Sequence, residues 1–429
     1  MSTRTLTAPA STAGTAPAAG TGRRSLVLYS AGALIALVLF AFMSPGGTAT
    51  FRLSAASDAF QIPALPVAVT PAGWTIALLL LAGTAYVLWL RRSGRGVPGW
   101  VPAVFALLFV SGVLIWMVAS ATNPSISLLS LLTGTLALAL PMVYGSMGGL
   151  LAERTGVVNI AIEGQLLLGA FAAALGGSIS GSLIGALVSA ALGGVIVSSL
   201  LTLFAVKYQV NQIIVGVVLN VLVSGLTGFL FGTLLSGGAG LNSPPRMPNL
   251  PIPVLSEIPI LGPLLFNQTI LGYLMFVLVA VLWVGLYKTR WGLRVRAVGE
   301  HPKAADTVGI KVNRTRVLNV LLGGAVAGLG GSFYTLVSVS QFSRDMTAGT
   351  GFIALAALIF GRWNPIGAFL ASLLFGFATN LQYVLSQAGT EVPSHFLAML
   401  PYVITILAVA GLVGASRAPA ASGQPYTKD

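Results

Sequence analysis

Cysteine is absent from this chain of 429 residues, and histidine occurs only as His301 and His395. Without cysteine there can be no disulfide framework, thiolate metal site or cysteine nucleophile. The two histidines stand too far apart in sequence to form a metal-ligand spacing, and both lie in or beside loops, so no Ser-His-Asp set is credible. The sequence also lacks the glycine-rich loop with Lys-Ser/Thr that cradles the phosphates of ATP. We therefore expect no catalytic residue, metal or cofactor in this chain.

Charge is scarce as well. Only 7% of the residues are charged, whereas 56% are hydrophobic. A soluble domain carries about a quarter charged residues, so most of this surface must face lipid. The net charge of +13 would suit nucleic acid, but the basic residues sit between apolar runs and form no continuous stripe. A positive-inside bias explains them better, and we expect no nucleic-acid partner.

Apolar runs near the length that crosses a bilayer recur along the chain. They lie near residues 25–43, 73–90, 100–120, 126–149, 160–177, 182–205, 212–235, 268–287, 317–338, 365–386 and 396–414. The run 350–360 is shorter and is typical of a half-helix or broken span. The sequence therefore predicts an all-α polytopic membrane protein with about 11–12 transmembrane passages.

The first run, 25–43, has two interpretations. Arg23 and Arg24 precede it and resemble a twin-Arg leader, which would make the run a cleaved signal. No clear small-x-small cleavage site follows, however, and further apolar runs do, which favours an uncleaved anchor. Residues 1–25 are rich in Ala, Thr, Ser, Pro and Gly and are expected to be a disordered tail.

Lysine and arginine predict the orientation. With the N-terminus inside and 350–360 counted as one passage, 19 of the 22 basic residues fall on the cytoplasmic side, and Arg52, Arg246 and Arg344 fall outside. The opposite orientation inverts that ratio, so we expect both termini in the cytoplasm. The outside loop 236–267 contains seven prolines and cannot form a long helix.

A shift of 182 positions predicts an internal repeat. It aligns Glu163 with Asp345, Gly169 with Gly351, Ala172 with Ala354, Gly185-Ala186 with Gly367-Ala368, and Gly194 with Gly376. Small residues align by chance in Gly/Ala-rich helices, but two of only nine acidic residues also coincide. In the predicted topology the segments after Glu163 and Asp345 run in opposite directions. The repeats are therefore inverted, as in many transporters with a midplane pathway.

Three stretches carry a family resemblance. They are Ala152–Gly164 (AERTGVVNIAIEG), Trp291–Ile310 (WGLRVRAVGEHPKAADTVGI) and Gly351–Ala368 (GFIALAALIFGRWNPIGA). Together they resemble the inner-membrane permeases of the ribose and branched-chain amino acid ABC importer superfamily. The match is closest to the nucleoside branch, often labelled simple-sugar permeases. Residues 1–97 depart from the shorter members of that family.

The resemblance implies a bacterial inner-membrane permease with a core of ten spans. It also implies three partners: a second homologous permease, cytoplasmic ATP-binding subunits and an extracytoplasmic substrate-binding lipoprotein. The expected domains are a tail at 1–25, an extension with two transmembrane helices at 26–97, a permease core at 98–416 and a cytoplasmic tail at 417–429. The implied substrate is a nucleoside, most of all a purine nucleoside, and the alternative substrate is a simple sugar. The alternative class of protein is an ion-coupled secondary transporter.

Polar residues within apolar spans are costly in hydrocarbon and mark candidate pathways. The candidates are Asn159, Glu163, Asn211, Asn220, Phe342, Asp345 and Asn380, with Phe342 as an aromatic face for a nucleobase. Each has a structural alternative. An asparagine can bridge two helices, and a carboxylate can lie at the positive end of a helix.

The inside loop 288–316 contains eight Lys or Arg and a candidate coupling helix. Pro302 suits the first turn of a helix and Gly309 the position just past its end. We expect Ala304, Ala305 and Val308 to form one small apolar face that docks on an ATPase domain, while flanking arginines contact acidic lipid headgroups or partner residues. The predicted coupling element comprises Gly299, Glu300, His301, Pro302, Ala304, Ala305, Val308 and Gly309. The alternative is a surface helix lying on the membrane.

Overall fold

The computed structural model describes residues 19–54, 61–237, 240–389, 399 and 417–427, with side chains described from residue 26 onward. Within these residues, nine helices are long and apolar enough to cross a membrane. Two shorter apolar helices cover Leu26–Phe42 and Thr350–Phe360. These findings confirm an all-α polytopic fold. The expected span near 396–414 lies outside the described residues, except for Met399.

By its internal contacts the chain divides into two units, and the first comprises Met1–Pro45 and Val69–Trp116. Its helices are α1 (Ala19–Ala36) with a π-helical continuation to Phe42, α2 (Val69–Arg92) and α3 (Trp100–Ala119). Phe40 is the centre of its packing, because Gly73 lies against the Phe40 carbonyl and Gly112 lies against the Phe40 ring. The packing thus groups α3 with α1 and α2, while the domain boundary near residue 98 stays a prediction.

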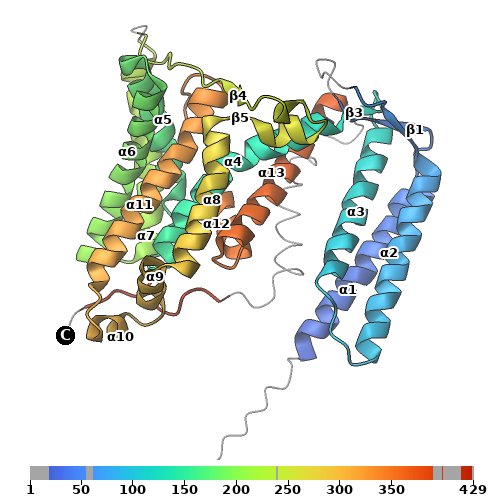
Figure 1. The fold of residues 1–429 in the computed structure, drawn as a ribbon, viewed down its shortest axis with the longest axis horizontal. Helices are drawn as coiled ribbons and strands as arrows, with labels where there is room; N and C mark the ends of the chain where they lie inside the picture. Colours follow the sequence, from blue (N-terminus) through green and yellow to red (C-terminus); the bar gives the residue numbers. More distant parts are fainter. Residues whose placement is uncertain (1–18, 55–60, 238–239, 390–398, 400–416, 428–429) are drawn as a thin grey trace, which may run out of the picture. The chain divides into compact units, whose positions relative to one another are not determined.

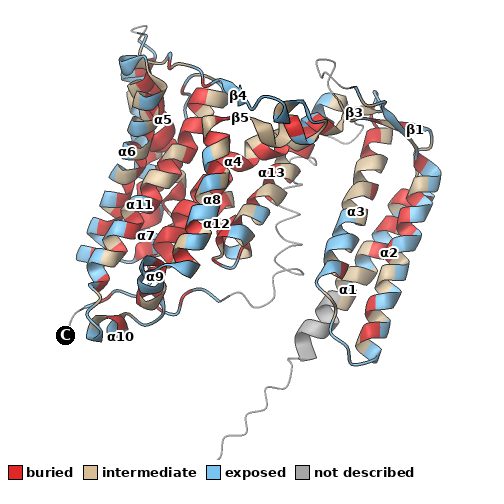
Figure 2. Ribbon diagram, viewed as in Figure 1, coloured by how far each residue is buried: buried red, intermediate tan, exposed pale blue. Residues whose placement is uncertain are grey.

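The second unit comprises Gly46–Ala68 and Met117–Asp429. Its transmembrane helices are α4 (Leu128–Glu153), α5 (Ile162–Ser180), α6 (Leu183–Thr202), α7 (Gln212–Leu230), α8 (Ile270–Lys288), α11 (Val312–Phe333), α12 (Thr350–Phe360) and α13 (Pro365–Ala388). Short π-helical turns continue α6, α7 and α11 to Lys207, Leu235 and Ser338. Helices α4, α5 and α11 are the most buried of the candidate spans, whereas α7 and α8 are the least buried in this unit (Figure 2). Apolar exposed helices in a membrane protein face lipid or partner subunits.

Two small sheets and two short helices mark opposite ends of the second unit (Figure 1). The strands β1 (Thr48–Arg52), β2 (Leu65–Ala68) and β3 (Ser125–Ser127) form a sheet of order β2-β1-β3, antiparallel on one side and parallel on the other. The strands β4 (Asn249–Pro251) and β5 (Asn267–Thr269) form an antiparallel pair. Helices α9 (Arg290–Glu300) and α10 (Pro302–Thr307) lie at the other end.

The proline-rich loop 236–267 forms no long helix in its described residues. A three-residue 3-10 turn (Leu255–Glu257) and a π turn (Gly262–Phe266) are the helical pieces that it contains. The expectation from its prolines is confirmed.

The packing of the helices follows the predicted repeat. The shift of 182 carries α4, α5 and α6 onto α11, α12 and α13, and the first residue of α6, Leu183, falls on the first residue of α13, Pro365. Helix α11 packs against α5 and α6, and its counterpart α4 packs against α12 and α13. Helix α4 descends from β3 toward the end with α9, whereas α11 rises from that end (Figure 1). These reciprocal contacts support two inverted repeats around the pair α4 and α11.

Repeat-related glycines sit at equivalent helix crossings. A Cβ on Gly194 of α6 would stand 1.9 Å from the Gly324 carbonyl oxygen of α11. A Cβ on Gly376 of α13 would stand 2.7 Å from the Thr135 carbonyl oxygen of α4. Such small residues let membrane helices approach closely. The alignment of Gly194 with Gly376 in the sequence therefore corresponds to a shared packing role.

Candidate functional site: a broken segment between two helix starts

The chain leaves helix at Arg154 and runs as a non-helical segment to Ala161 before α5 begins. Its first residue is fixed to the loop after α12, because the Arg154 guanidinium donates to the Trp363 carbonyl, with Nε at 2.8 Å. The Trp363 indole in turn donates to the Glu153 carboxylate. Glu163, just past the other end, bonds to the start of α12, as described next. Since α12 has 11 residues, about 16 Å at 1.5 Å each, the segment spans roughly half a bilayer.

Glu163 joins the starts of two helices. It lies in the first turn of α5, and its carboxylate accepts three hydrogen bonds from the start of α12. The donors are Thr347 Oγ1 at 2.7 Å, the Gly349 amide at 2.8 Å and the Gly351 amide at 2.6 Å. A carboxylate is stabilised at a helix N-terminus by the free amides and the positive dipole end. Glu163 lies at the N-terminus of α5 and accepts amides from the N-terminus of α12. This supports the alternative in which the carboxylate has a structural role at a helix terminus.

Two asparagines secure the same break. The amide of Asn220 on α7 accepts from the Gly164 N–H at 2.9 Å and donates to the Ile160 carbonyl at 2.9 Å. Asn159 is fully buried and donates to the side chain of Gln165 at 3.1 Å. The Gln165 side-chain amide in turn donates to the Ser198 hydroxyl on α6 at 2.8 Å. These bonds satisfy polar groups where the helical ladder is interrupted, as a membrane interior requires.

Asp345, which the repeat aligns with Glu163, lies in the loop 339–349 before α12 and makes different contacts from Glu163. It is exposed, it adopts a left-handed backbone with φ of 48°, and the Ser224 hydroxyl of α7 donates to its carboxylate at 2.6 Å. Ser340 and Ala348 in the same loop also have positive φ, at 60° and 45°. Such backbone conformations are disfavoured for residues other than glycine and cluster at functional sites. The neighbouring Arg344 lies over the Phe231 ring and makes a cation-π contact at 5.6 Å.

Three other predicted pathway residues have structural contacts away from this break. Asn211 caps α7 by accepting from the amides of the next residues. Asn380 donates to the Leu131 carbonyl at 2.7 Å across α13 and α4. Phe342 is buried between the rings of Phe171 and Phe231. The bridging interpretation therefore fits Asn380, a capping role fits Asn211 and a core role fits Phe342, and a pathway role for each stays a prediction.

The sequence reasoning missed Gln165, Ser198 and Thr347, which complete the polar network. Gln165 and Ser198 lie within apolar runs and meet the criterion already used, a polar residue inside a span. Thr347 lies in a loop, where a polar residue carries no such signal.

Helices α9 and α10 have the local geometry that the sequence predicts. Pro302 is the first residue of α10, and Gly309 follows its end with φ of +83°. The His301 N–H is bonded to the Ala297 carbonyl, and Glu300 ends α9. Gly299 packs against the Arg154 carbonyl so closely that a Cβ would stand 2.2 Å from its oxygen.

The expected apolar face of α10 requires a correction. Ala305 is 3% exposed and packs with Val298 and Val312 of this chain, so it cannot dock on a partner. Ala304 is exposed, and Val308 is 75% exposed. A helix of two turns cannot place all three residues on one outward face when α9 and α11 cover one side of it. The outward face therefore consists of Ala304 and Val308.

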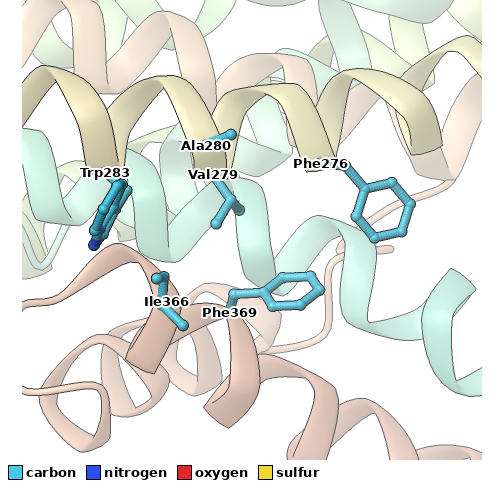
Figure 3. Close-up of a pocket in the computed structure, with 6 residues that line it drawn as sticks. All are labelled: Phe276, Val279, Ala280, Trp283, Ile366 and Phe369. Carbon is cyan, nitrogen blue, oxygen red and sulfur yellow. The ribbon is translucent and has the colours of Figure 1, made fainter.

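A groove between α8 and α13 is lined only by apolar side chains, among them Phe276, Trp283 and Phe369 (Figure 3). The indole N–H of Trp283 is the one hydrogen-bonding side-chain group in this lining, and it cannot satisfy the several hydroxyl groups of a polar substrate. It therefore does not suit a sugar or a nucleoside, and it lies away from the polar break around Glu163.

Residues 131–409 match the family described as the branched-chain amino acid transport system permease component. The match covers more than half of the chain, so the chain belongs to this permease family. The match begins within α4, which leaves α1, α2 and α3 outside it. No solved structure matches.

Three relatives are informative. The nucleoside ABC transporter permease protein NupC of Lactococcus lactis is 40% identical over 67% of this chain and 93% of its own length. The guanosine ABC transporter permease protein NupQ of Bacillus subtilis is 37% identical over 68% of this chain and 95% of its own length. The putative glucose ABC transporter permease protein TsgC13 of Haloferax volcanii is 34% identical over 59% of this chain and 76% of its own length. The expected family is thus confirmed, and the chain is a multi-pass membrane permease.

Proposed function

We propose that this chain is the translocation subunit of an ABC importer for nucleosides, purine nucleosides first, and that partner subunits hydrolyse the ATP. One observation carries the substrate class: the relatives named for nucleoside and guanosine transport match over nearly their whole length. The remaining partners in the proposal are a second homologous permease and an extracytoplasmic binding lipoprotein in a bacterial inner membrane.

The polar break supports an uncharged substrate. Glu163 lies at the start of α5, and its carboxylate is bonded by three donors of this chain. A nucleoside carries no charge, so it can pass without Glu163 giving up these hydrogen bonds to bind a cation. An ion-coupled carrier that used Glu163 would have to break all three bonds in every cycle, which disfavours that alternative.

Coupling to the ATP-binding subunit is assigned to the outward face of α10. Val308 and Ala304 supply a small apolar contact, and Arg290 and Arg294 lie on the adjoining helix α9. The end of the unit with α9 and α10 also carries Arg154 and Arg316. This concentration of basic residues supports its cytoplasmic placement and the inside position of the described C-terminal residues.

Two valines of similar exposure at opposite ends of the unit test the docking site. Val308→Asp places a charge on the proposed contact, and Val254→Asp is the control in the outside loop, where Val254 is 78% exposed. We expect Val308→Asp to abolish co-purification of the ATP-binding subunit and Val254→Asp to leave it unchanged. Equal retention in both variants would place the docking contact elsewhere.

A simple sugar is the second candidate, because a relative named for glucose is 34% identical. Competition of labelled guanosine uptake in cells separates the two substrates. Unlabelled purine nucleosides should abolish the labelled uptake, whereas ribose and glucose should leave it unchanged. Uptake of labelled glucose or ribose without any guanosine uptake would favour the sugar importer.

A further inference from the structure

The described C-terminal residues 417–427 form a strap across the end of the second unit that carries α9 and α10. The Ala421 N–H donates to the Gly299 carbonyl at 2.9 Å, and the Gly423 N–H donates to the Gly156 carbonyl at 3.0 Å. The Ala420 N–H donates to the Glu300 carboxylate at 3.2 Å. The strap therefore binds both the end of α9 and the start of the broken segment.

Burial shows that the strap is part of the packed structure. Ala421 is 3% exposed and Tyr426 is 8% exposed. Tyr426 lies in one apolar cluster with Val298 of α9, Ala305 of α10 and Val312 of α11. The strap thus completes the small core that holds the two coupling helices against α11.

Arg316 fastens the strap to the broken segment. This side chain is 1% exposed, and it donates to the Thr155 carbonyl at 3.2 Å through Nε and to the Gln424 carbonyl at 2.9 Å through Nη1. Gly156 makes room for this arrangement, because a Cβ there would stand 2.9 Å from the Ala421 carbonyl oxygen and 3.1 Å from Arg316 Nη2. Burying a cation is costly unless its hydrogen bonds are made, and loss of the strap removes one of the two carbonyls that bind this guanidinium.

We infer that the strap is a positioning element that transmits displacement of α9 and α10 to the segment Arg154–Ala161, and so to Glu163. This inference rests on the proposed function, since it assumes that α10 receives the motion of an ATP-binding subunit. The strap contacts α9, the first turn of the segment and, through Tyr426, the buried Ala305 of α10. Val308, the docking contact, is 75% exposed and does not belong to that cluster. Loss of the strap should therefore uncouple the permease without releasing the ATP-binding subunit.

Two alanines in the strap provide a matched test. Ala421→Glu forces a charge into the buried contact, and Ala418→Glu is the control, because Ala418 is exposed. The assembled importer is reconstituted in proteoliposomes with its substrate-loaded binding protein. We expect Ala421→Glu to lower guanosine uptake per inserted permease about tenfold, which corresponds to about 1.4 kcal/mol. Its ATPase rate should no longer respond to the loaded binding protein, while co-purification of the ATP-binding subunit stays at the level of Ala418→Glu.

A second variant, truncated after residue 416, removes the strap without introducing a charge. The same loss of uptake and of stimulated ATPase activity, with the ATP-binding subunit retained, supports the inference. Unchanged uptake in the truncated permease overturns it, and so does parallel loss of the ATP-binding subunit, which would make the strap a docking element. Failure of the proposed function is distinguishable, because the unaltered importer would then show no ATP-dependent guanosine uptake.

Discussion

The repeat-related helices α5 and α12 each have an acidic residue near their start, but the two carboxylates make different contacts. In the first turn of α5, Glu163 is partly buried and accepts three hydrogen bonds from the start of α12. Before α12, Asp345 is exposed, has a left-handed backbone and receives a hydrogen bond from Ser224. One carboxylate holds two helix starts together, and the other remains accessible from outside the unit.

This difference shows that an inverted repeat does not preserve the role of an aligned residue. The offset of 182 aligns an acidic residue with an acidic residue, Glu163 with Asp345, and a glycine with a glycine at the helix crossings, Gly194 with Gly376. Burial then decides the role. A partly buried carboxylate requires several donors, whereas an exposed one is solvated and contributes little to stability. We therefore expect Glu163 to hold α5 and α12 together and to transmit displacement between them, whereas Asp345 is expected to make only an exposed contact with Ser224.

Gly351→Ala should have the largest effect. A Cβ there would stand 2.4 Å from the Glu163 backbone, so α12 and α5 would have to separate, at a cost of about 1–3 kcal/mol or more. We expect lower membrane abundance and loss of guanosine uptake. Gly225→Ala on α7 is the control, since nothing lies within 4 Å of a Cβ at that position. Normal behaviour of both variants would contradict the close contact.

Glu163→Gln should come next. The amide retains one acceptor oxygen but turns an NH₂ group toward an N–H or O–H donor, which costs about 1–3 kcal/mol for an unsatisfied bond. We expect guanosine uptake per inserted permease to fall about tenfold or more and the thermal unfolding midpoint to fall. Uptake and thermal stability are the measurements. A variant that equals the unaltered permease in both would show that the bonds from Glu163 to the start of α12 are not needed.

Asp345→Asn should have a smaller effect. Asparagine tolerates a left-handed backbone and keeps the oxygen that accepts from Ser224. Only an exposed charge is lost, which is worth about 0.2–1 kcal/mol, so uptake should fall no more than about fivefold. Abundance and thermal stability should not change. A loss of uptake equal to that of Glu163→Gln would remove the distinction between the two breaks.

Ser224→Ala should have the smallest effect. It removes one hydrogen bond to an exposed carboxylate that water can replace, so the net cost is at most about 1 kcal/mol. We expect uptake to change by no more than about fivefold, and by less than in Asp345→Asn measured beside it. A larger loss than that of Asp345→Asn would show that Ser224, rather than the aspartate, makes the important contact.

The sequence predicts the fold well because hydropathy, length and glycine position are local signals. The spans that fall within the described residues, the short helix α12, the proline-rich loop and the ends of α10 agree with the structure. The repeat was visible because the offset of 182 aligns two acidic residues, Glu163 and Asp345, and two glycines at helix crossings, Gly194 and Gly376. These features depend on the residue itself or on its near neighbours.

The contacts of the site were less predictable because they join distant segments. The sequence does not show that Glu163 bonds to residues 347–351 rather than to a nearby arginine, or that Arg154 bonds to the loop after α12. It also placed Ala305 on the outward face of α10. The covering contacts come from Val298 and Val312, and from Tyr426 more than a hundred residues away. Side-chain burial in so short a helix is set by tertiary packing, not by its own pattern.

The energy source of guanosine uptake distinguishes an ABC importer from an ion-coupled carrier. The permease is reconstituted in proteoliposomes with its partner permease, ATP-binding subunits and guanosine-loaded binding protein, and ion gradients are collapsed with ionophores. We expect guanosine accumulation that requires ATP, persists without any gradient and stops when the ATP-binding subunit is catalytically inactive. Accumulation that follows an imposed proton or sodium gradient and continues with the inactive subunit would show an ion-coupled carrier instead.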